Sequence, residues 1–284
     1  MLIVNPETPL EPHVVEVLRA IDTATKELGI ASLLIGATAR DVIMYHVFGR
    51  RPTRASHDVD FALLVDGWDM FGELKDRLVS TGQFAAEKGS AQRMLYRQMA
   101  TGYEFMVDLI PFGGVENQAQ KIVWPPEFSM IMNVAGFKDV LEASSKVQVE
   151  SNLVVDVASL PGLSLLKLMA WVDRGDNRDA SDLVDLLRSY EVMGNQERIY
   201  TVGNNVIESV AYDPELMGAW LLGHDTAEIV TGKTRAMALS ILTDQAQMVR
   251  LSNAMANALR GRADGFSYAT RIIELYRDGL ASIE

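Results

Sequence analysis

The chain contains no cysteine, so disulfide bonds, thiolate catalysis and cysteine-ligated zinc are all excluded. Histidine occurs only four times, at scattered positions that show no metal-ligand spacing. No apolar run approaches the roughly 18 residues that a membrane span needs. The first residues lack the basic and apolar segments that are typical of a signal peptide. We therefore expect a cytoplasmic protein without a membrane partner.

Positive charge is also scarce. The chain has 26 Lys and Arg residues and 38 Asp and Glu residues, which gives a formal net charge of -12. This balance disfavours a protein that binds nucleic acid by charge alone. The chain has 284 residues, of which 48% are hydrophobic and 23% charged, so its composition is globular. Its length fits one large domain or two ordinary ones.

The hydrophobic pattern divides the chain into two parts of different character. In the first part, the spacing of apolar residues predicts helices over 12–28, 39–48, 69–80 and 137–144 and strands over 31–35, 58–65, 92–99, 103–110 and 146–155, with a loop-rich excursion over 111–135. The second part is helical, with Asn177 as a predicted N-cap and Gly223-His224-Asp225 as a turn between helices. We predict an α+β fold with a mixed domain, residues 1–158, and an all-helical domain, residues 159–284.

Three aspartates lie on two of the predicted strands. Asp58 and Asp60 begin the apolar strand 58–65, and they share a face because side chains alternate along a strand. Two such carboxylates repel unless a cation lies between them, and hard oxygen ligands suit Mg²⁺ or Mn²⁺. If strand 103–110 is a neighbour, its Asp108 completes a two-metal site for displacement at phosphorus. The alternative is a solvated strand end, with Asp108 capping its own strand before Pro111.

The strand 31–35 enters the next helix through Gly36, Ala37 and Thr38. Backbone N–H groups at such a strand-to-helix turn favour phosphate. Positive charge then gathers locally in an otherwise acidic chain, at Arg40, Arg50, Arg51 and Arg54. This local reversal suits an anionic substrate. Equally, Arg40 can pair with a nearby acid in a solvated loop.

These motifs, in this order, resemble the nucleotidyltransferase superfamily, which includes polymerase β and CCA-adding enzymes. The superfamily pattern is a Gly-Gly or Gly-Ser turn after a strand, then Asp-x-Asp on the next strand, then a third Asp on a later one. In the helical part, Lys167 on an apolar helix, Arg174 and the segment Arg178-Asp179-Ala-Ser-Asp182 are similar to the AbiEii/AbiGii toxin type. The resemblance covers roughly residues 31–190.

The resemblance implies a nucleotidyltransferase-type mixed sheet with flanking helices and transfer of a nucleoside monophosphate from an NTP to an acceptor hydroxyl. Asp58 and Asp60 would hold Mg²⁺ or Mn²⁺, and Asp108 would complete the metal site or assist the base. Lys167 would reach the triphosphate from the helical domain, although such a Lys can equally be a snorkelling surface residue. The other nucleotide-binding residues that it implies are Gly36, Ala37, Thr38, Arg40, Arg54, Ser56, Asp179 and Asp182.

The resemblance also implies a cognate antitoxin, and it leaves the acceptor open among tRNA, a protein side chain and a small molecule. Ala37 departs from the superfamily turn, because no Ser hydroxyl is available there and any side-chain contact must come from Thr38. An alternative is therefore a degenerate nucleotidyltransferase that binds a nucleotide or regulates a partner without transfer. A tRNA-modifying enzyme of the CCA type is a third option. The lack of a long Lys/Arg-rich C-terminal region and the Lys167 motif argue against it.

Overall fold

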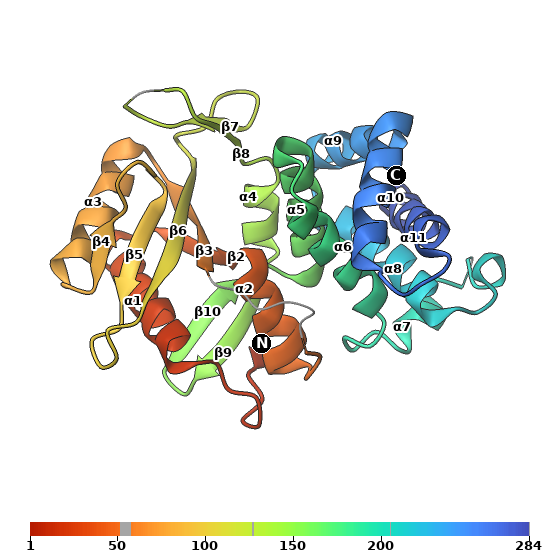
Figure 1. Cartoon of the computed structure of the whole chain (residues 1–284), viewed down its shortest axis with the longest axis horizontal. Coiled ribbons are helices and arrows are strands. Elements are labelled where there is room, and N and C mark those ends of the chain that lie inside the picture. Colours follow the sequence, from red (N-terminus) through yellow and green to blue (C-terminus); the bar gives the residue numbers. More distant parts are fainter. Residues whose placement is uncertain (52–57, 127, 205, 284) are drawn as a thin grey trace. The chain divides into compact units, whose positions relative to one another are not determined.

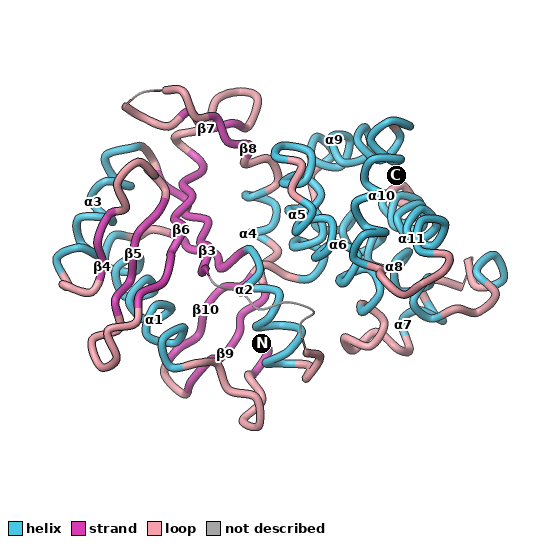
Figure 2. Tube along the Cα trace, in the orientation of Figure 1, coloured by secondary structure: helices cyan, strands magenta, loops and turns pink. Residues whose placement is uncertain are grey.

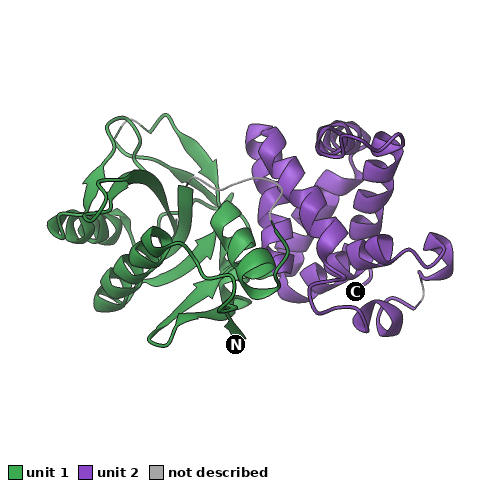
Figure 3. Ribbon diagram, turned by 60° about the horizontal axis from the view of Figure 1, so that its bottom comes forward, with its two compact units in different colours: residues 1–159 green, residues 160–284 purple. Residues whose placement is uncertain are grey.

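The computed structural model describes residues 1–51, 58–126, 128–204 and 206–283 (Figure 1). The chain divides into two compact units, Met1–Ser159 and Leu160–Glu284 (Figure 3). The first contains a large mixed sheet and the second contains helices, which confirms the predicted α+β class (Figure 2). Within the described ranges, no helix combines the length and the apolar character that crossing a membrane requires.

The first unit is built on an eight-stranded sheet with the order β1-β9-β10-β2-β3-β6-β5-β4. Strand β3 pairs antiparallel with β2 and parallel with β6, and β6 pairs antiparallel with β5. The strands of this sheet are β1 (Leu2–Ile3), β2 (Ala31–Ile35), β3 (Asp58–Val65), β4 (Phe84–Ala86), β5 (Arg93–Arg97), β6 (Glu104–Gly113), β9 (Ser145–Glu150) and β10 (Leu153–Val157). Strands β7 (Lys121–Val123) and β8 (Ile131–Asn133) form a separate antiparallel pair.

Helices α1 (Pro12–Leu28) and α3 (Trp68–Ser80) pack against each other and against the sheet (Figure 1). The ring of His13 in α1 lies 4.9 Å from the ring of Phe105 in β6. Because side chains alternate along a strand, Phe105 and Val107 face α1, whereas Asp108 faces the opposite side of the sheet. Helix α2 (Gly36–Asp41) continues into the π-helical segment η1 (Val42–Val47), and α4 (Phe137–Glu142) follows the β7–β8 pair.

The structure differs from the sequence predictions at several places in this unit, and strands β1 and β4 were not predicted. Residues 146–155 form the end of β9 and the start of β10, joined by a turn at Ser151 and Asn152, because apolar alternation that continues across a tight turn is read as one strand. The helix predicted over 39–48 already begins at Gly36. The excursion 111–135 contains the end of β6 and the pair β7–β8. Its Trp124 is only 2% exposed and packs on Trp68 of α3.

The described residues of the second unit form helices joined by turns and loops, with no strand among them. Its helices are α5 (Leu160–Arg174), α6 (Asn177–Ser189), α7 (Arg198–Thr201), the 3-10 segment η2 (Glu208–Val210), α8 (Pro214–Ile229), α9 (Gly232–Thr243), α10 (Gln245–Ala258) and α11 (Gly265–Leu280). Helices α8 and α11 approach so closely that a β-carbon on Gly223 would lie 2.0 Å from the carbonyl oxygen of Tyr276. A β-carbon on Gly279 would lie equally close to the carbonyl oxygen of Trp220, so glycine is required on both helices.

Two local predictions in the helical unit are wrong. The N-cap of α6 is Asp176 and not Asn177, because the Asp176 carboxylate accepts a 2.8 Å hydrogen bond from the backbone N–H of Arg178. The segment Gly223-His224-Asp225 lies inside α8 rather than in a turn. In that helix Gly223 allows close packing of two helices, so its presence does not mark a helix end.

Candidate active site

The three predicted aspartates lie on the face of the sheet that points away from α1. In the strand register Asp60 is paired with Ile35 of β2 on one side and with Asp108 of β6 on the other, and Asp108 is in turn paired with Arg93 of β5. Directly paired residues point to the same face of a sheet. Asp58 shares that face because it lies two residues before Asp60. The predicted adjacency of the two acid-bearing strands is confirmed, and we call Asp58, Asp60 and Asp108 the acidic row.

The strand-to-helix turn lies directly against this row. Gly36 has a φ of +73°, a left-handed conformation that glycine adopts without steric cost. A β-carbon at Gly36 would lie 2.0 Å from Oδ2 and 2.8 Å from Cγ of Asp60. The turn predicted to hold phosphate and the second aspartate are therefore in van der Waals contact. Ala37 follows in α2 and is buried.

The side chains of Thr38 and Arg40 are engaged within the first unit. The Thr38 hydroxyl donates a 2.7 Å hydrogen bond to the backbone carbonyl of Asp58, which ties α2 to the start of β3. Arg40 is 1% exposed and donates to Oδ1 of Asp41 from Nη2 at 2.6 Å and from Nε at 2.9 Å. Pairing with an acid is confirmed, but inside a helix rather than in a solvated loop. A buried guanidinium needs such a partner, and the structure does not bring Arg40 to the surface. The predicted residues Arg54 and Ser56, and His57, lie outside the described residues.

Arg93 belongs to this site and was missed by the sequence reasoning. Its Nε donates to Oδ1 of Asp108 at 2.7 Å and its Nη2 donates to Oδ2 at 2.9 Å, so both carboxylate oxygens are engaged. The hydrogen bonds to Asp108 raise the pKa of Arg93 above its ordinary value, and the charges of Glu87 and Asp58 raise it further. Only the register of the β5–β6 hairpin reveals this pairing, because the two residues are 15 positions apart.

A cavity of about 300 Å³ lies at the start of β3, between residues of α1, α2 and β6, and Asp58 is the member of the acidic row that lines it. Asp58 and Thr38 contribute to its wall, together with the rings of His13, Tyr103 and Phe105. The ring of His13 lies 5.7 Å from that of Tyr103, in an edge-on arrangement. Aromatic walls next to a carboxylate are suited to a planar or partly apolar group of a substrate.

Lys167 in α5 is 7% exposed, so the snorkelling alternative is wrong. Its Nζ lies 2.7 Å from Oδ2 of Asp182 and 3.2 Å from Oδ1 of Asp179, and Arg174 pairs with Asp179 at 2.7 Å. The structure therefore brings the three predicted residues Lys167, Asp179 and Asp182 together in the helical unit. Burial of these carboxylates is tolerated because each faces a cation. In this arrangement the ammonium group of Lys167 is directed at the two aspartates of α6.

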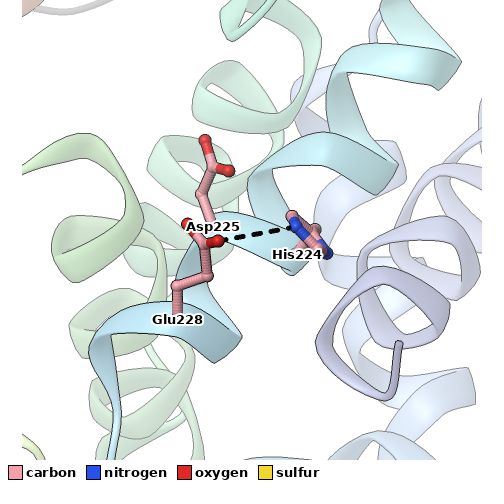
Figure 4. A group of neighbouring side chains, drawn as sticks. All are labelled: His224, Asp225 and Glu228. Carbon is pink, nitrogen blue, oxygen red and sulfur yellow. Dashed lines mark ion pairs between the residues drawn. The ribbon is translucent and has the colours of Figure 1, made fainter. Parts of the chain in front are cut away.

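A second group of potential metal ligands lies in α8. Among the described residues, His224, Asp225 and Glu228 bring their ligand atoms within 4.8 Å of one another (Figure 4). Asp225, however, accepts hydrogen bonds from Nη1 and Nη2 of Arg198, at 2.7 Å each, and from the Tyr190 hydroxyl. The nearby carboxylate also raises the pKa of Tyr190, together with burial, which is the larger cause. These contacts give Asp225 a structural role, so we do not assign the metal site to this group.

Comparison with known families identifies the protein class. Residues 19–255 match the family described as "Nucleotidyl transferase AbiEii toxin, Type IV TA system", where TA denotes toxin–antitoxin. The match spans most of the chain and includes the whole acidic row, the Gly36 turn and the Lys167 cluster. The chain belongs to this family and is a nucleotidyltransferase. No curated protein matches the chain.

The solved structures that the chain matches include the following three, each with a TM-score below 0.5. The antibiotic-resistance factor ANT(2'')-Ia is 12% identical, with a TM-score of 0.37 over 72% of this chain and 99% of that chain. A STING-associated CdnE c-di-GMP synthase from Capnocytophaga granulosa is 8% identical, with a TM-score of 0.33 over 95% of this chain and 80% of that one. The CCA-adding enzyme of Thermotoga maritima is 9% identical, with a TM-score of 0.26 over 97% and 82% of the two chains. At these values no residue role is transferred from them.

Proposed function

We propose that this nucleotidyltransferase transfers a nucleoside monophosphate from a magnesium- or manganese-bound NTP to an acceptor hydroxyl, and that the acidic row is its catalytic centre. One observation carries the proposal. Asp60 is paired in register with Asp108 and at the same time packs on the Gly36 turn, which joins carboxylate ligands and a strand-to-helix turn in one place. These are the two components that a phosphate-transferring site needs.

The donor atoms of the row suit a hard divalent cation. Asp58 and Asp60 share a face, both are partly exposed, and carboxylate oxygens are the ligands that Mg²⁺ and Mn²⁺ prefer. Because Gly36 has no β-carbon, the Asp60 carboxylate occupies space that a side chain at position 36 would fill. We propose Asp58 and Asp60 as metal ligands, with Asp108 completing the site or assisting deprotonation of the acceptor. A bound Mg²⁺ supplies positive charge that offsets the negative charge of the phosphates.

The chemistry is an in-line displacement at the α-phosphorus. The acceptor oxygen forms a new bond to this phosphorus, and the bond from the phosphorus to the oxygen that bridges to the β-phosphate breaks. Pyrophosphate leaves, and the proton of the acceptor hydroxyl passes to a carboxylate of the row or to water. For the N–H groups of Gly36, Ala37 and Thr38 we propose contact with the phosphates. The cavity beside Asp58 is our candidate for a bound organic group of the NTP or acceptor.

The second group of side chains in the proposal comes from the helical unit. We propose that Lys167, Asp179 and Asp182 act on the nucleotide as a pre-arranged cluster. Because the Lys167 ammonium group is already paired with two carboxylates, a triphosphate that contacts it must share its charge with Asp179 and Asp182. The type IV toxin–antitoxin description of the family supports a cognate antitoxin as partner. The acceptor remains one of tRNA, a protein side chain or a small molecule.

The test is transfer from NTPs that carry a radiolabelled α-phosphate, with purified protein and a cell lysate as acceptor source. Asp58→Asn and Asp60→Asn keep the side-chain shape but remove the charge, so we expect each to lower labelling by at least about a hundredfold. Asp66→Asn is the matched control, because this exposed aspartate follows the other end of β3. Wild-type labelling by either row variant contradicts the mechanism. A wild-type protein that binds an NTP but labels nothing points instead to a degenerate binding module.

A further inference from the structure

Arg93 places a positive charge at the end of the acidic row. The first residue of β5 supplies this side chain, whose guanidinium donates to both oxygens of Asp108. Glu87 is a second carboxylate neighbour, with its Oε2 3.7 Å from Nε of Arg93. Asp108 is 9% exposed, so its charge is largely removed from water and depends on this partner. Bidentate pairing of this kind also holds the carboxylate in one orientation.

The same charge acts on the rest of the row. In the strand register Arg93 is paired with Asp108, and Asp108 with Asp60. Asp58 lies on the same face two residues before Asp60, so the positive charge acts on all three carboxylates. Three carboxylates on one face repel one another, and Arg93 offsets part of that repulsion. A divalent cation placed at the row would meet the same guanidinium as a like charge. The cation and Arg93 therefore compete for the same carboxylate, that of Asp108.

We propose that Arg93 is a positioning residue that serves as the resident counter-ion of Asp108, and that a divalent cation must compete with it for the acidic row. This inference rests on the proposed function, because it takes the row to be the metal site. Arg93 then stabilises the metal-free protein and weakens metal binding. A unit charge about 5 Å from a dication lowers the affinity of the dication by about tenfold, even at the dielectric constant of water.

The first test is a calorimetric titration of the full-length, metal-free protein with Mn²⁺ and with Mg²⁺. Arg93→Gln removes the competing charge, and we expect it to bind either ion about tenfold more tightly than the wild type. Arg93→Lys keeps the charge but loses the bidentate geometry, so we expect an affinity between those two. Arg97→Gln is the matched control, since this arginine lies four residues along β5 and pairs with Glu104, and it should leave the affinity unchanged. An Arg93→Gln affinity equal to or weaker than wild type overturns the inference.

The second test is thermal unfolding with and without metal. Without metal, Arg93→Gln leaves Asp108 without its partner, so we expect a lower midpoint than that of the wild type. With saturating Mn²⁺ the difference between the two unfolding midpoints should become smaller, because the ion replaces the positive charge that Arg93→Gln removes. A difference that is the same with and without Mn²⁺ means that Arg93 has only a structural role and overturns the inference.

Asp60→Asn separates failure of this inference from failure of the proposed function. If this variant binds Mn²⁺ as the wild type does, the row is not the metal site, and both the proposed function and the inference fall. If it loses Mn²⁺ binding while Arg93→Gln binds as the wild type does, the metal site stands and only the role of Arg93 is refuted.

Discussion

Replacing Gly36 by alanine tests whether contact between the turn and the acidic row matters. The β-carbon of Gly36→Ala would lie 2.0 Å from Oδ2 of Asp60, so either the Asp60 carboxylate or the turn must move. The φ of +73° adds strain of its own. Gly29→Ala is the matched control, because Gly29 has a φ of +68° but has no atom near enough for a new β-carbon to meet. The two variants thus share the backbone strain and differ in the collision.

The expected magnitudes follow from these two terms. A left-handed alanine costs about 1–2 kcal/mol, which is the whole effect expected for Gly29→Ala. Forcing an atom into filled space costs about 1–3 kcal/mol more, so Gly36→Ala should lose about 2–5 kcal/mol of unfolding free energy. Displacement of a catalytic group by about 1 Å can lower the rate by roughly a hundredfold, and we expect at least that loss of transfer for Gly36→Ala.

Urea unfolding monitored by circular dichroism measures the stability of both variants, and α-labelled NTP transfer measures their activity. Gly29→Ala should retain transfer at temperatures where it is folded, whereas Gly36→Ala should lose it even when folded. Weakened Mn²⁺ binding by folded Gly36→Ala would show that the loss acts through Asp60. If the two alanine variants match in both stability and transfer, the contact between turn and carboxylate has no functional role and the reasoning is refuted.

Two further predictions concern the helical unit. Lys167→Met removes the cation that faces Asp179 and Asp182, two almost fully buried carboxylates. We therefore expect the unfolding free energy measured in urea to fall by about 3–5 kcal/mol. Adding Asp182→Asn should restore part of this loss, and an unchanged stability of Lys167→Met contradicts the ion-pair cluster. Asp176 caps α6, and its hydrogen bonds with Arg178 lower its pKa to about 2. Because the folded-state pKa is depressed, the contribution of Asp176 is complete above about pH 4 and is lost as the pH falls toward 2. Asp176→Ala should therefore cost about 1 kcal/mol at pH 7 and progressively less below pH 4, and a pH-independent cost would exclude the carboxylate as its source.

Much of the fold follows from local patterns. Strand β3 begins and ends at the residues that the sequence predicts, because a run of apolar and β-branched residues is closed by Asp66 and Gly67. Helix α1 also matches its predicted bounds, with Pro12 in its first turn and Gly29 as a left-handed cap. Errors arose where one local pattern allows two structures. The strand prediction over 146–155 failed because a two-residue turn interrupts the alternation without any Gly or Pro.

The sequence by itself determined the chemical types at the site: three aspartates on two apolar strands, a glycine turn before them, and a lysine in an apolar helix. These are local facts, since alternation along a strand already decides that Asp58 and Asp60 share a face. Only the tertiary structure decided which distant groups meet them. Register between β5 and β6 places Arg93 on Asp108, and helix packing turns Lys167 toward Asp182. The reason is that a shift of one residue in register would send Arg93 to the other face, and no local pattern specifies that alignment.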